Sequence, residues 1–390
     1  MKLIYFNNGS GLGTAKSGGT VRHIETARGL MVLGTGVYIV TTPGARVLYK
    51  NENLCPKKFF IVKASILKNT ETSNFDRAFS YIISTIHSLL LVPFLPKVGI
   101  VYAPSDYFCD VIPSLFYKLV YQAKLVIMIH HVCKSPFRRK GNFLLNLVSY
   151  VGQRIDYFLA RLFAYKVLVY DTPEGENIAT MIFGKDIPKN KVSYVLNGLN
   201  FAEIAEVPQG DKIYDACFSG GLRHTKGIYD IVPVWCRVCE YKEDAILLVA
   251  GAGTAKITKD LKGKISEAGL EHNVILAGGL DSPTLYKILK QSRVFISLSH
   301  EEGWGISVAE ALAAGLPVVA FELPAFRYLG DKIITIKKFD HVCFADTIID
   351  LLKDGRLGVK KSRKGIDFIK KYGWMEIAKT EFEILKTLEE

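Results

Sequence analysis

The chain has 390 residues, of which 49% are hydrophobic and 23% are charged, and its formal net charge at pH 7 is +12. This length predicts two or three domains, with ample apolar residues for buried cores. Seven scattered cysteines, an odd number, argue against a complete disulfide framework and favour a reducing compartment. No repeat period of about 20–50 residues occurs, which argues against a solenoid.

The excess of positive over negative charge lies entirely in the first half of the chain. Residues 1–200 hold 24 lysines and arginines against 11 acidic residues, whereas residues 201–390 hold 26 against 27. A one-sided basic field suits a polyanion or an anionic membrane surface, and a merely solubilising basic surface is the alternative. Because the basic half has no recognisable DNA- or RNA-binding motif, no nucleic-acid partner is expected.

The chain opens with "MKLIYFNNG", an apolar strand that runs into a polar loop. This stretch lacks the charged, apolar and small-residue regions of a signal peptide, so we expect no export and a cytoplasmic location. Further along, the apolar tract 81–103 is interrupted by His87, Pro93, Pro96 and Lys97. We therefore predict a buried helix followed by a strand there, and no membrane-spanning helix.

Apolar, β-rich runs alternate with helical patterns in both halves, which is typical of βαβ units around parallel sheets. The expected strands are residues 2–7, 36–42, 97–103, 124–130 and 166–171, and then 215–220, 245–251, 273–278, 293–299 and 317–321. Residues 197–212 between the two sets end in a segment of linker character. The pattern predicts an α/β protein with two doubly wound, Rossmann-like domains.

Residues 134–166 form a basic, apolar segment with seven basic residues and one acid. One helical stripe is apolar and is expected to supply the domain core; it comprises Phe143, Leu144, Leu147, Val148, Val151, Ile155, Phe158, Leu159 and Leu162. Leu145, Tyr150 and Tyr157 lie off that stripe. The extra apolar surface suggests an interfacial element on anionic lipid, and a fully buried helix is the alternative.

In open parallel sheets, ligands bind at the carboxyl ends of the strands, so the loops there are the candidates for chemistry. The loop after the first strand is glycine-rich but lacks the dinucleotide fingerprint spacing. Its Gly18 and Gly19 would let backbone amides approach an anion, although a plain flexible loop would look similar. His130 and His131 end the strand 124–130; either could bind a sugar hydroxyl or phosphate, or carry a proton. A structural histidine is the alternative.

Two further loops lie in the second half. "SGGLRHTKG" places Arg223 and Lys226 beside a glycine pair, as a diphosphate site requires; solvated surface charge is the alternative. "SHEEGWGISVAEALAAG" places Glu302 in a glycine-rich loop and Glu310 about one turn into a helix expected over residues 306–314. The free amides at the start of that helix favour an anion. A sugar nucleotide fits, because carboxylates accept hydrogen bonds from vicinal diols.

Residues 197–321 resemble the retaining glycosyltransferases of family 4, which have the GT-B fold. The resemblance rests on "EGWGISVAEALAAGLPVVAF" with its Glu-x7-Glu element, on "NVILAGGLDSPTLYKILKQSRVFISLS", and on "SGGLRHTKG", "LLVAGAG" and "VLNGLN" upstream. The first half agrees through "SGGTVRHIETARGL" and the strand-end histidine, and "YGWMEIAKTEFEIL" resembles the family's last helix. The resemblance implies two Rossmann-like domains facing each other across a cleft, with the C-terminal helix crossing back to the first.

The resemblance also implies domain bounds and residue roles. Residues 1–198, with helix 374–390, would bind the acceptor, and residues 199–373 would bind the donor. Glu302 would contact the transferred sugar, Glu310 the ribose and Lys226 the diphosphate. The remaining implied site residues are Gly18, Gly19, His130, Gly253, Leu280, Gly303, Trp304, Gly305 and Ile306. The family's usual arginine is Gly221 here, so Arg223 would replace it from a shifted position.

The implied activity is hexosyl transfer from a nucleotide sugar to a hydroxyl acceptor, with retention at the anomeric carbon. The chain has no Asp-x-Asp element, which agrees with the family's metal-independent chemistry, and no cofactor is expected. With the basic half in mind, we expect a lipid-linked or membrane-borne glycan acceptor and peripheral membrane contact. A sugar-nucleotide epimerase and a non-catalytic sugar-nucleotide or glycan-binding subunit are the alternatives.

Overall fold

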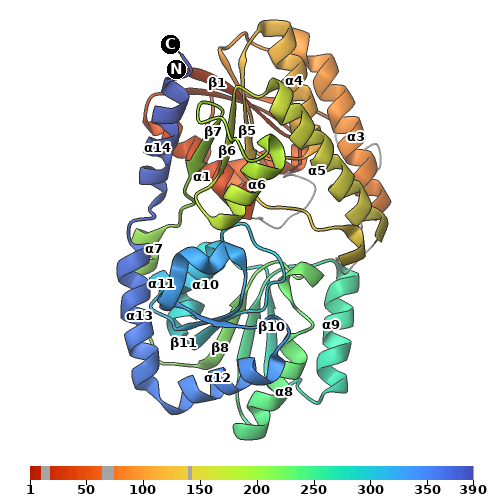
Figure 1. The fold of residues 1–390 in the computed structure, drawn as a ribbon. Helices are drawn as coiled ribbons and strands as arrows, with labels where there is room; N and C mark the ends of the chain where they lie inside the picture. Colours follow the sequence, from red (N-terminus) through yellow and green to blue (C-terminus); the bar gives the residue numbers. More distant parts are fainter. Residues whose placement is uncertain (10–17, 64–73, 139–142, 390) are drawn as a thin grey trace. The chain divides into compact units, whose positions relative to one another are not determined.

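The computed structural model describes residues 1–9, 18–63, 74–138 and 143–389 (Figure 1). The chain divides into two compact units: unit 1 comprises Met1–Asn197 and Trp374–Glu390, and unit 2 comprises Gly198–Gly373. The sequence placed the boundary one residue further on, after residue 198. Each unit is built around one parallel sheet, which confirms the predicted α/β class.

Unit 1 contains a seven-stranded parallel sheet in the order β3-β2-β1-β4-β5-β6-β7. Its strands are β1 (Lys2–Asn7), β2 (Gly36–Thr41), β3 (Lys58–Ile61), β4 (Ile100–Ala103), β5 (Lys124–Ile129), β6 (Lys166–Tyr170) and β7 (Val192–Val195). Its helices are α1 (Gly18–Val32), α2 (Pro43–Asn51), α3 (Asn74–Leu91), α4 (Phe108–Tyr121), α5 (Phe143–Phe163), α6 (Pro173–Phe183) and α14 (Trp374–Lys386). Two 3₁₀ turns, η1 (Val92–Phe94) and η2 (Pro136–Arg138), complete the unit.

The helices of unit 1 form two layers. Right-handed crossovers place α1 and α2 on one face of the sheet and α3, α4, α5 and α6 on the other. The C-terminal α14 packs on α1 so closely that a side chain on Gly29 would lie 2.2 Å from the Ala378 Cβ atom. The pair is also joined by a buried ion pair, in which Arg22 Nη2 lies 2.6 Å from Glu381 Oε2. The last helix of the chain therefore belongs to the first unit.

Unit 2 contains a six-stranded parallel sheet in the order β10-β9-β8-β11-β12-β13. Its strands are β8 (Tyr214–Ser219), β9 (Leu247–Ala250), β10 (Val274–Gly278), β11 (Ser292–Ser297), β12 (Val318–Phe321) and β13 (Ile334–Ile336). Its helices are α7 (Phe201–Glu206), α8 (Ile231–Tyr241), α9 (Ala255–Glu267), α10 (Ser282–Gln291), α11 (Ile306–Ala313), α12 (His341–Lys353) and α13 (Gly355–Ile369), with the 3₁₀ segments η3 (His224–Lys226) and η4 (Pro324–Lys332). Trp235, Phe321 and Phe344 are among the largest side chains of its core.

The sequence prediction for α5 was wrong in one respect. The apolar stripe that was expected to form the core faces outward, so that Ile155, Phe158 and Leu162 are at least half exposed. The opposite side of the helix, which includes Gln153 and Asp156, is buried instead, and so is Tyr157, which was expected to add apolar surface but belongs to the core. Periodicity located the stripe correctly but assigned it to the wrong side. Leu144 and Leu145, which the interpretation also used, have side chains outside the described set.

The apolar tract after residue 80 was also only partly understood. It forms α3 and β4, as expected, and Val101 and Tyr102 of β4 are buried. The helix, however, is not fully buried, because Ile82, Ile86 and Leu90 are about half exposed or more. No helix among the described residues is long and apolar enough to cross a membrane.

Candidate active site

The loop after β8 carries the glycine pair and the two cations that the sequence singled out. Backbone hydrogen bonds join it to the next strand loop: Gly220 N donates to Ala250 O at 2.9 Å, and Leu222 N donates to Ala252 O at 2.8 Å. A side chain on Gly251 would lie 1.8 Å from the Gly220 carbonyl oxygen, so this approach requires glycine. The loop then turns into η3, which ends with Lys226.

Glu302 lies in the loop after the neighbouring strand β11 and forms an ion pair with Lys226 through its Oε1 atom. The same oxygen accepts a hydrogen bond of 2.9 Å from the Ser299 hydroxyl. The two loops are also joined through their backbones, since His300 N donates to Thr225 O at 2.8 Å. The side chains of Lys226 and Glu302 are 21% and 11% exposed, so the pair is sheltered yet still open to solvent.

Arg223 bends back over the glycine that replaces the family's arginine. A Cβ atom built on Gly221 would lie 3.2 Å from Nε and 3.3 Å from Nη2 of Arg223. The guanidinium therefore lies against the backbone of residue 221, where an arginine side chain at that position would begin. Arg223 is exposed, which leaves its five N–H donors available to an anion. That Arg223 replaces the missing arginine stays a prediction.

Gly303, Trp304 and Gly305 lead into α11, which begins at Ile306 as predicted. Gly305 has a φ of 92°, and a side chain there would lie 2.6 Å from Cε1 of Phe326, so both backbone and packing demand glycine. Trp304 is buried and stacks on Tyr328 with ring centroids 5.5 Å apart. Its indole anchors the loop, and its backbone is the part that can face a ligand. No side chain caps the start of α11, which leaves its first amides for other acceptors.

Glu310 lies one turn into α11 and is partly buried. Its charge, together with that of Glu203, acts on Tyr286 of α10, and these charges add to burial in raising the pKa of that tyrosine. Glu302 and Glu310 therefore stand in different surroundings: the first is paired with a lysine, and the second lies beside a buried phenol.

Gly253 and Leu280 lie in the loops after β9 and β10. These loops are joined by a 2.7 Å hydrogen bond from Gly251 N to Gly278 O. A side chain on Gly253 would lie 2.7 Å from the Leu222 Cβ atom, so this loop packs directly on the loop that carries Arg223. The residues proposed from sequence for unit 2 thus share one edge of its sheet.

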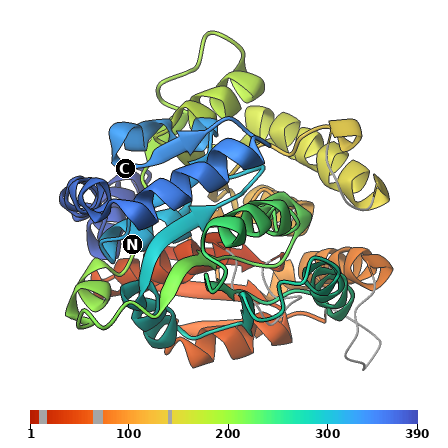
Figure 2. The same cartoon turned by 90° about the horizontal axis from the view of Figure 1, so that it is seen from below.

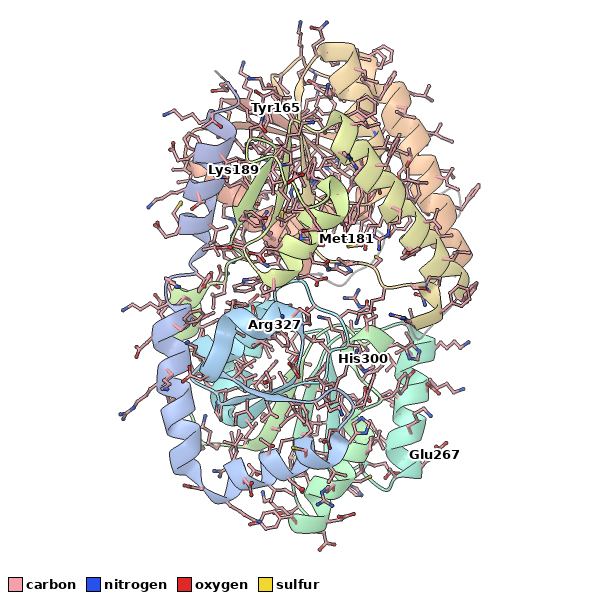
Figure 3. All side chains as sticks on the ribbon, in the orientation of Figure 1. Tyr165, Met181, Lys189, Glu267, His300 and Arg327 are labelled. Carbon is pink, nitrogen blue, oxygen red and sulfur yellow. The ribbon has the colours of Figure 1, made fainter. Side chains whose placement is uncertain are left out.

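The sequence analysis missed a polar network that holds the Glu302 loop. His300, labelled in Figure 3, places its Nε2 atom 2.7 Å from Asp230 Oδ2, and His341 Nε2 lies 2.8 Å from Asp230 Oδ1. Burial raises the pKa of Asp230, but the hydrogen bonds and charges of the two histidines outweigh it and hold the pKa below its usual value. These three residues are far apart in the sequence, and no motif connects them.

In unit 1, Gly18 and Gly19 begin α1, and a side chain on Gly19 would lie 3.3 Å from Nε2 of His130. The preceding loop residues 10–17 lie outside the described residues. His130 Nε2 lies 2.8 Å from Pro104 O, which can only accept, so this nitrogen carries the proton and Nδ1 accepts from the Tyr170 hydroxyl. Burial and the nearby charge of Arg22 lower the pKa of His130 to about 3. His130 is therefore a neutral hydrogen-bonding group at neutral pH.

His131, the other histidine of this loop, contributes its carbonyl oxygen as an acceptor for Gln153 Nε2 at 2.8 Å. Among the described residues, no group of three or more His, Cys, Asp or Glu side chains is arranged to hold a metal ion.

The strand order explains why the Lys226–Glu302 pair forms. In unit 2 the chain proceeds from β8 to β9 and β10 in one direction and from β11 to β12 and β13 in the other, so β8 and β11 flank the topological switch point. Loops on either side of such a point leave room for a ligand at the carboxyl ends of the strands. Lys226 and Glu302 come from these two loops.

Solved structures share the whole fold. The chain aligns over its full length with 99% of sucrose-phosphate synthase from Thermosynechococcus elongatus, with a TM-score of 0.78 and 14% identity. Alignment with the Anabaena protein HepE, solved with UDP and glucose, covers 99% of this chain and all of that one, with a TM-score of 0.75 and 15% identity. Two parallel-sheet α/β domains of this kind define the class of GT-B proteins.

Residues 201–369, which make up nearly all of unit 2, match the family model of the group 1 glycosyl transferases. Phosphatidyl-myo-inositol mannosyltransferase from Mycobacterium leprae is 26% identical over 42% of this chain and 43% of its own length. A GDP-mannose:cellobiosyl-diphosphopolyprenol alpha-mannosyltransferase from Xanthomonas oryzae is 20% identical over 50% of this chain and 53% of its own. The chain spans about half the length of the curated relatives it matches.

Proposed function

We propose that the protein transfers a hexose from a nucleoside diphosphate sugar to a hydroxyl acceptor, with retention of configuration and without a metal ion. The observation that carries the proposal is the Lys226–Glu302 pair at the switch point of unit 2, with Arg223 lying over Gly221 beside it. A carboxylate suits sugar hydroxyls, and two cations suit a diphosphate.

The cations and the carboxylate of the proposed site would contact different parts of the donor. Lys226, Arg223 and the amides at the start of α11 would neutralise the diphosphate as the bond from the anomeric carbon to its phosphate oxygen breaks. The acceptor oxygen bonds to that carbon from the same face, and its proton passes to the departing phosphate oxygen, so that no enzyme nucleophile is needed. Glu302 would orient the sugar hydroxyls, with Ser299 and Lys226 fixing its carboxylate.

Further contacts would hold the nucleoside. Glu310 is assigned to the ribose hydroxyls, because a carboxylate one turn into α11 follows the amides that would hold the diphosphate. Gly253 and Leu280 are assigned to the base, since their loops lie at the same sheet edge as the loop of Arg223. Gly18, Gly19 and His130 of unit 1 are assigned to the substrates. His130, as a neutral group, would exchange its hydrogen bond to Pro104 O or to the Tyr170 hydroxyl for one to a substrate.

The base and the sugar are open to a direct binding test. Neighbours with this fold bind UDP or UDP-glucose, and some relatives are named as users of GDP-mannose. A thermal-shift screen over UDP, GDP, ADP and their sugars is expected to show one nucleotide series that raises the melting temperature, because a ligand bound to the folded state stabilises it.

The proposed acceptor is a lipid-linked or membrane-borne glycan. Support comes from the names of two relatives, one acting on phosphatidyl-myo-inositol and one on a cellobiosyl-diphosphopolyprenol. The basic balance of residues 1–200 agrees with such a substrate, because an anionic lipid phosphate is attracted to positive surface.

The decisive test is sugar transfer by Lys226→Ala and Glu302→Ala variants. Removal of one group that stabilises charge in the transition state costs about 10²–10³-fold in kcat, and we expect losses of this size. Arg237→Ala is the matched control, because Arg237 is also an ion-paired cation of unit 2 but contacts Asp346 of α12 instead. Near-normal turnover by both site variants, with folded protein, would remove the proposed site.

Product analysis separates the reaction classes. Transfer with retention gives an acceptor glycoside of the donor's anomeric configuration, which the anomeric proton signal in an NMR spectrum reports. An epimerised nucleotide sugar formed without acceptor would contradict transferase activity, and donor binding without any turnover would indicate a binding subunit. Activity is expected to survive EDTA, since the proposed neutralising groups are protein cations.

A further inference from the structure

The outer helical layer of unit 1 exposes many apolar side chains while it buries several polar ones. In α3, the serines at positions 80, 84 and 88, spaced by one helical turn, are buried, whereas Ile82, Ile86 and Leu90 are 48–66% exposed. Small serines let α3 approach its neighbour α4 closely, and the helix can satisfy its own hydroxyls: Ser84 Oγ donates to Tyr81 O at 3.0 Å. Apolar side chains of a soluble helix normally lie on the opposite side.

Helix α5 also exposes apolar side chains, and it buries a carboxylate. Its buried side contributes Tyr157 and Ala160 to the core but also holds Gln153 and Asp156, and both carboxylate oxygens of Asp156 lie buried without a hydrogen-bond partner in the described structure. Its outward side holds a continuous apolar stripe of Val148, Val151, Ile155, Phe158 and Leu162, with exposed fractions of 44–61%. A helix that buries an acid while exposing such a stripe is organised for an apolar environment outside the protein.

Helix α4 lies between α3 and α5 and connects the two stripes. It packs against both neighbours, and Phe116, Leu119 and Val120 on its outer side are exposed. All three helices belong to the layer on one face of the sheet, and they lie together in both views (Figures 1 and 2). We call the exposed apolar residues of α3, α4 and α5 the outer apolar face.

Such a face is unusual in a soluble protein. Contiguous exposed apolar patches larger than a few hundred Å² mark surfaces that bind a partner or a membrane. In the described part of unit 2 the exposed large apolar residues are few and come from separate elements: Ile213, Tyr241, Ile275, Phe339 and Val342. The outer apolar face therefore needs an occupant, and scattered exposure does not explain it.

The charges of the three helices favour one occupant. Among the described side chains of α3, α4 and α5, the lysines and arginines are Lys118, Arg154 and Arg161, none of which is buried, and the two acids, Asp110 and Asp156, are buried. A second copy of the chain using the same face would bring these like charges together. A bilayer with anionic headgroups satisfies both features, because the apolar side chains enter the acyl boundary and the cations meet phosphates.

We propose that unit 1 docks on an anionic lipid bilayer through the outer apolar face of α3, α4 and α5. The surface is broader than the single basic helix indicated by the sequence. The inference goes beyond the proposed function and does not depend on it, because the donor site was derived from other residues in unit 2.

Vesicle flotation tests the proposal with the full-length protein. We expect the protein to float with vesicles that contain phosphatidylcholine and phosphatidylglycerol. We expect it to bind vesicles of phosphatidylcholine alone more weakly, and to bind the anionic vesicles more weakly at high salt. The double variant Ile86→Ser, Ile155→Ser is expected to bind about tenfold less, because it removes apolar area from two of the three helices. The double variant Lys118→Gln, Arg161→Gln is expected to lower binding about fivefold or more, on the anionic vesicles only.

The matched control is Ile213→Ser, Ile275→Ser in unit 2. Ile213 is 54% exposed and Ile86 is 53% exposed. The control therefore makes the same substitution at a side chain of similar exposure in unit 2. Thermal melts must show that all variants stay folded.

The proposal is overturned if the wild-type protein does not float with anionic vesicles, or if the unit 2 control reduces binding equally. It is also overturned if sedimentation shows a dimer that the Ile86→Ser, Ile155→Ser change dissociates while vesicle binding is unaffected. Donor-induced thermal shifts, measured in parallel, report on the donor site separately.

Discussion

The two units have the same parallel-sheet architecture but distribute polar residues in opposite ways. Unit 1 buries many charged and polar side chains, including Arg22, Asp110, Asp156 and Glu381, and leaves long apolar side chains on its surface. In unit 2 the buried charged residues are few, namely Asp215, Asp230 and Lys290 among its described side chains, and its apolar residues fill the core.

This difference shows that one fold can be stabilised in two ways. Unit 2 follows the ordinary rule, in which apolar burial stabilises the core and charges collect at the ligand-binding edge. Unit 1 buries more polar groups, and some of their atoms, such as both carboxylate oxygens of Asp156, have no hydrogen-bond partner in the described structure. Its stability should therefore respond more strongly to pH and to the loss of single polar partners. Four experiments address this contrast.

The largest effect is expected from Glu381→Ala. Glu381 is fully buried, pairs with Arg22 and accepts a 2.8 Å hydrogen bond from the Tyr102 hydroxyl. The truncation leaves a buried guanidinium unpaired, which costs about 3–5 kcal/mol. Urea unfolding should show this loss, whereas Glu376→Ala, at an exposed ion pair of the same helix, should leave the midpoint nearly unchanged. Equal midpoints for both variants would contradict the importance of the buried network.

A second experiment compares two buried aspartates of unit 1. Burial, reinforced by the charges of Asp106 and Asp110, raises the pKa of Asp156 to about 8. Its stabilising contribution is complete below the unfolded pKa, near 4, and is lost as the pH rises toward 8, because the unfolded chain releases a proton that the folded chain retains. Asp156→Asn should therefore be more stable than wild type by about 2–4 kcal/mol at pH 7, and this gain should shrink toward zero at pH 4.

Asp110→Asn is the matched control for this substitution. Burial raises the pKa of Asp110 to about 7, but hydrogen bonds from the Ser105 hydroxyl, from Asn8 N at 2.5 Å and from Gly9 N at 3.0 Å oppose that rise. At pH 7 we therefore expect Asp110→Asn to gain less stability than Asp156→Asn, because the amide weakens these hydrogen bonds. Denaturant unfolding of both variants across pH 4–8 gives the comparison, and a destabilised Asp156→Asn at pH 7 would show that its carboxylate has a stabilising partner.

A smaller effect is expected from relocating the arginine of unit 2. The double variant Gly221→Arg, Arg223→Gly moves the guanidinium to the family's usual position, and should retain transfer activity within about tenfold of wild type, a change of about 1.4 kcal/mol in the barrier. Arg223→Gly alone should be less active than the double variant. If the single variant is as active as wild type, Arg223 has no part in diphosphate binding.

The smallest effect concerns His130. Its lowered pKa, about 3, keeps the imidazole neutral in the folded state above pH 4, while the unfolded chain takes up a proton below about pH 6.5. This residue therefore adds stability that is lost as the pH falls from about 6.5 to 3. Its NMR signals should not titrate between pH 5 and 8, and a titration near pH 6.5 would show that the Tyr170 and Pro104 contacts do not hold it neutral.

The central strands were predictable from sequence, and so was the edge strand β10, but the other three edge strands were not. Each buried central strand is a short apolar run, which is why β1, β4 and β5 were found. The missed strands β3, β7 and β13 all lie at sheet edges, where half-exposed residues break the apolar pattern. Their pairing depends on a neighbour already in place, so local sequence carries a weak signal.

The candidate site was predictable to the extent that it lies in short motifs. Glycines, cations and carboxylates placed directly after strands identified Arg223, Lys226 and Glu302, because parallel strands end at a common edge. The network of Asp230, His300 and His341 could not be found in this way, since it joins three segments that are distant in the chain. The position of Arg223 over Gly221 also required the folded loop.

The sequence by itself determined the two α/β units, the glycine-dependent turns and the residue types at the donor edge, because strand periodicity and backbone freedom are local properties. Tertiary structure alone decided which side of each amphipathic helix faces inward. A helical stripe has the same period whether it packs on a sheet or faces outward, so only the neighbouring helices and the sheet could reveal that α3 and α5 turn their apolar sides away from the core.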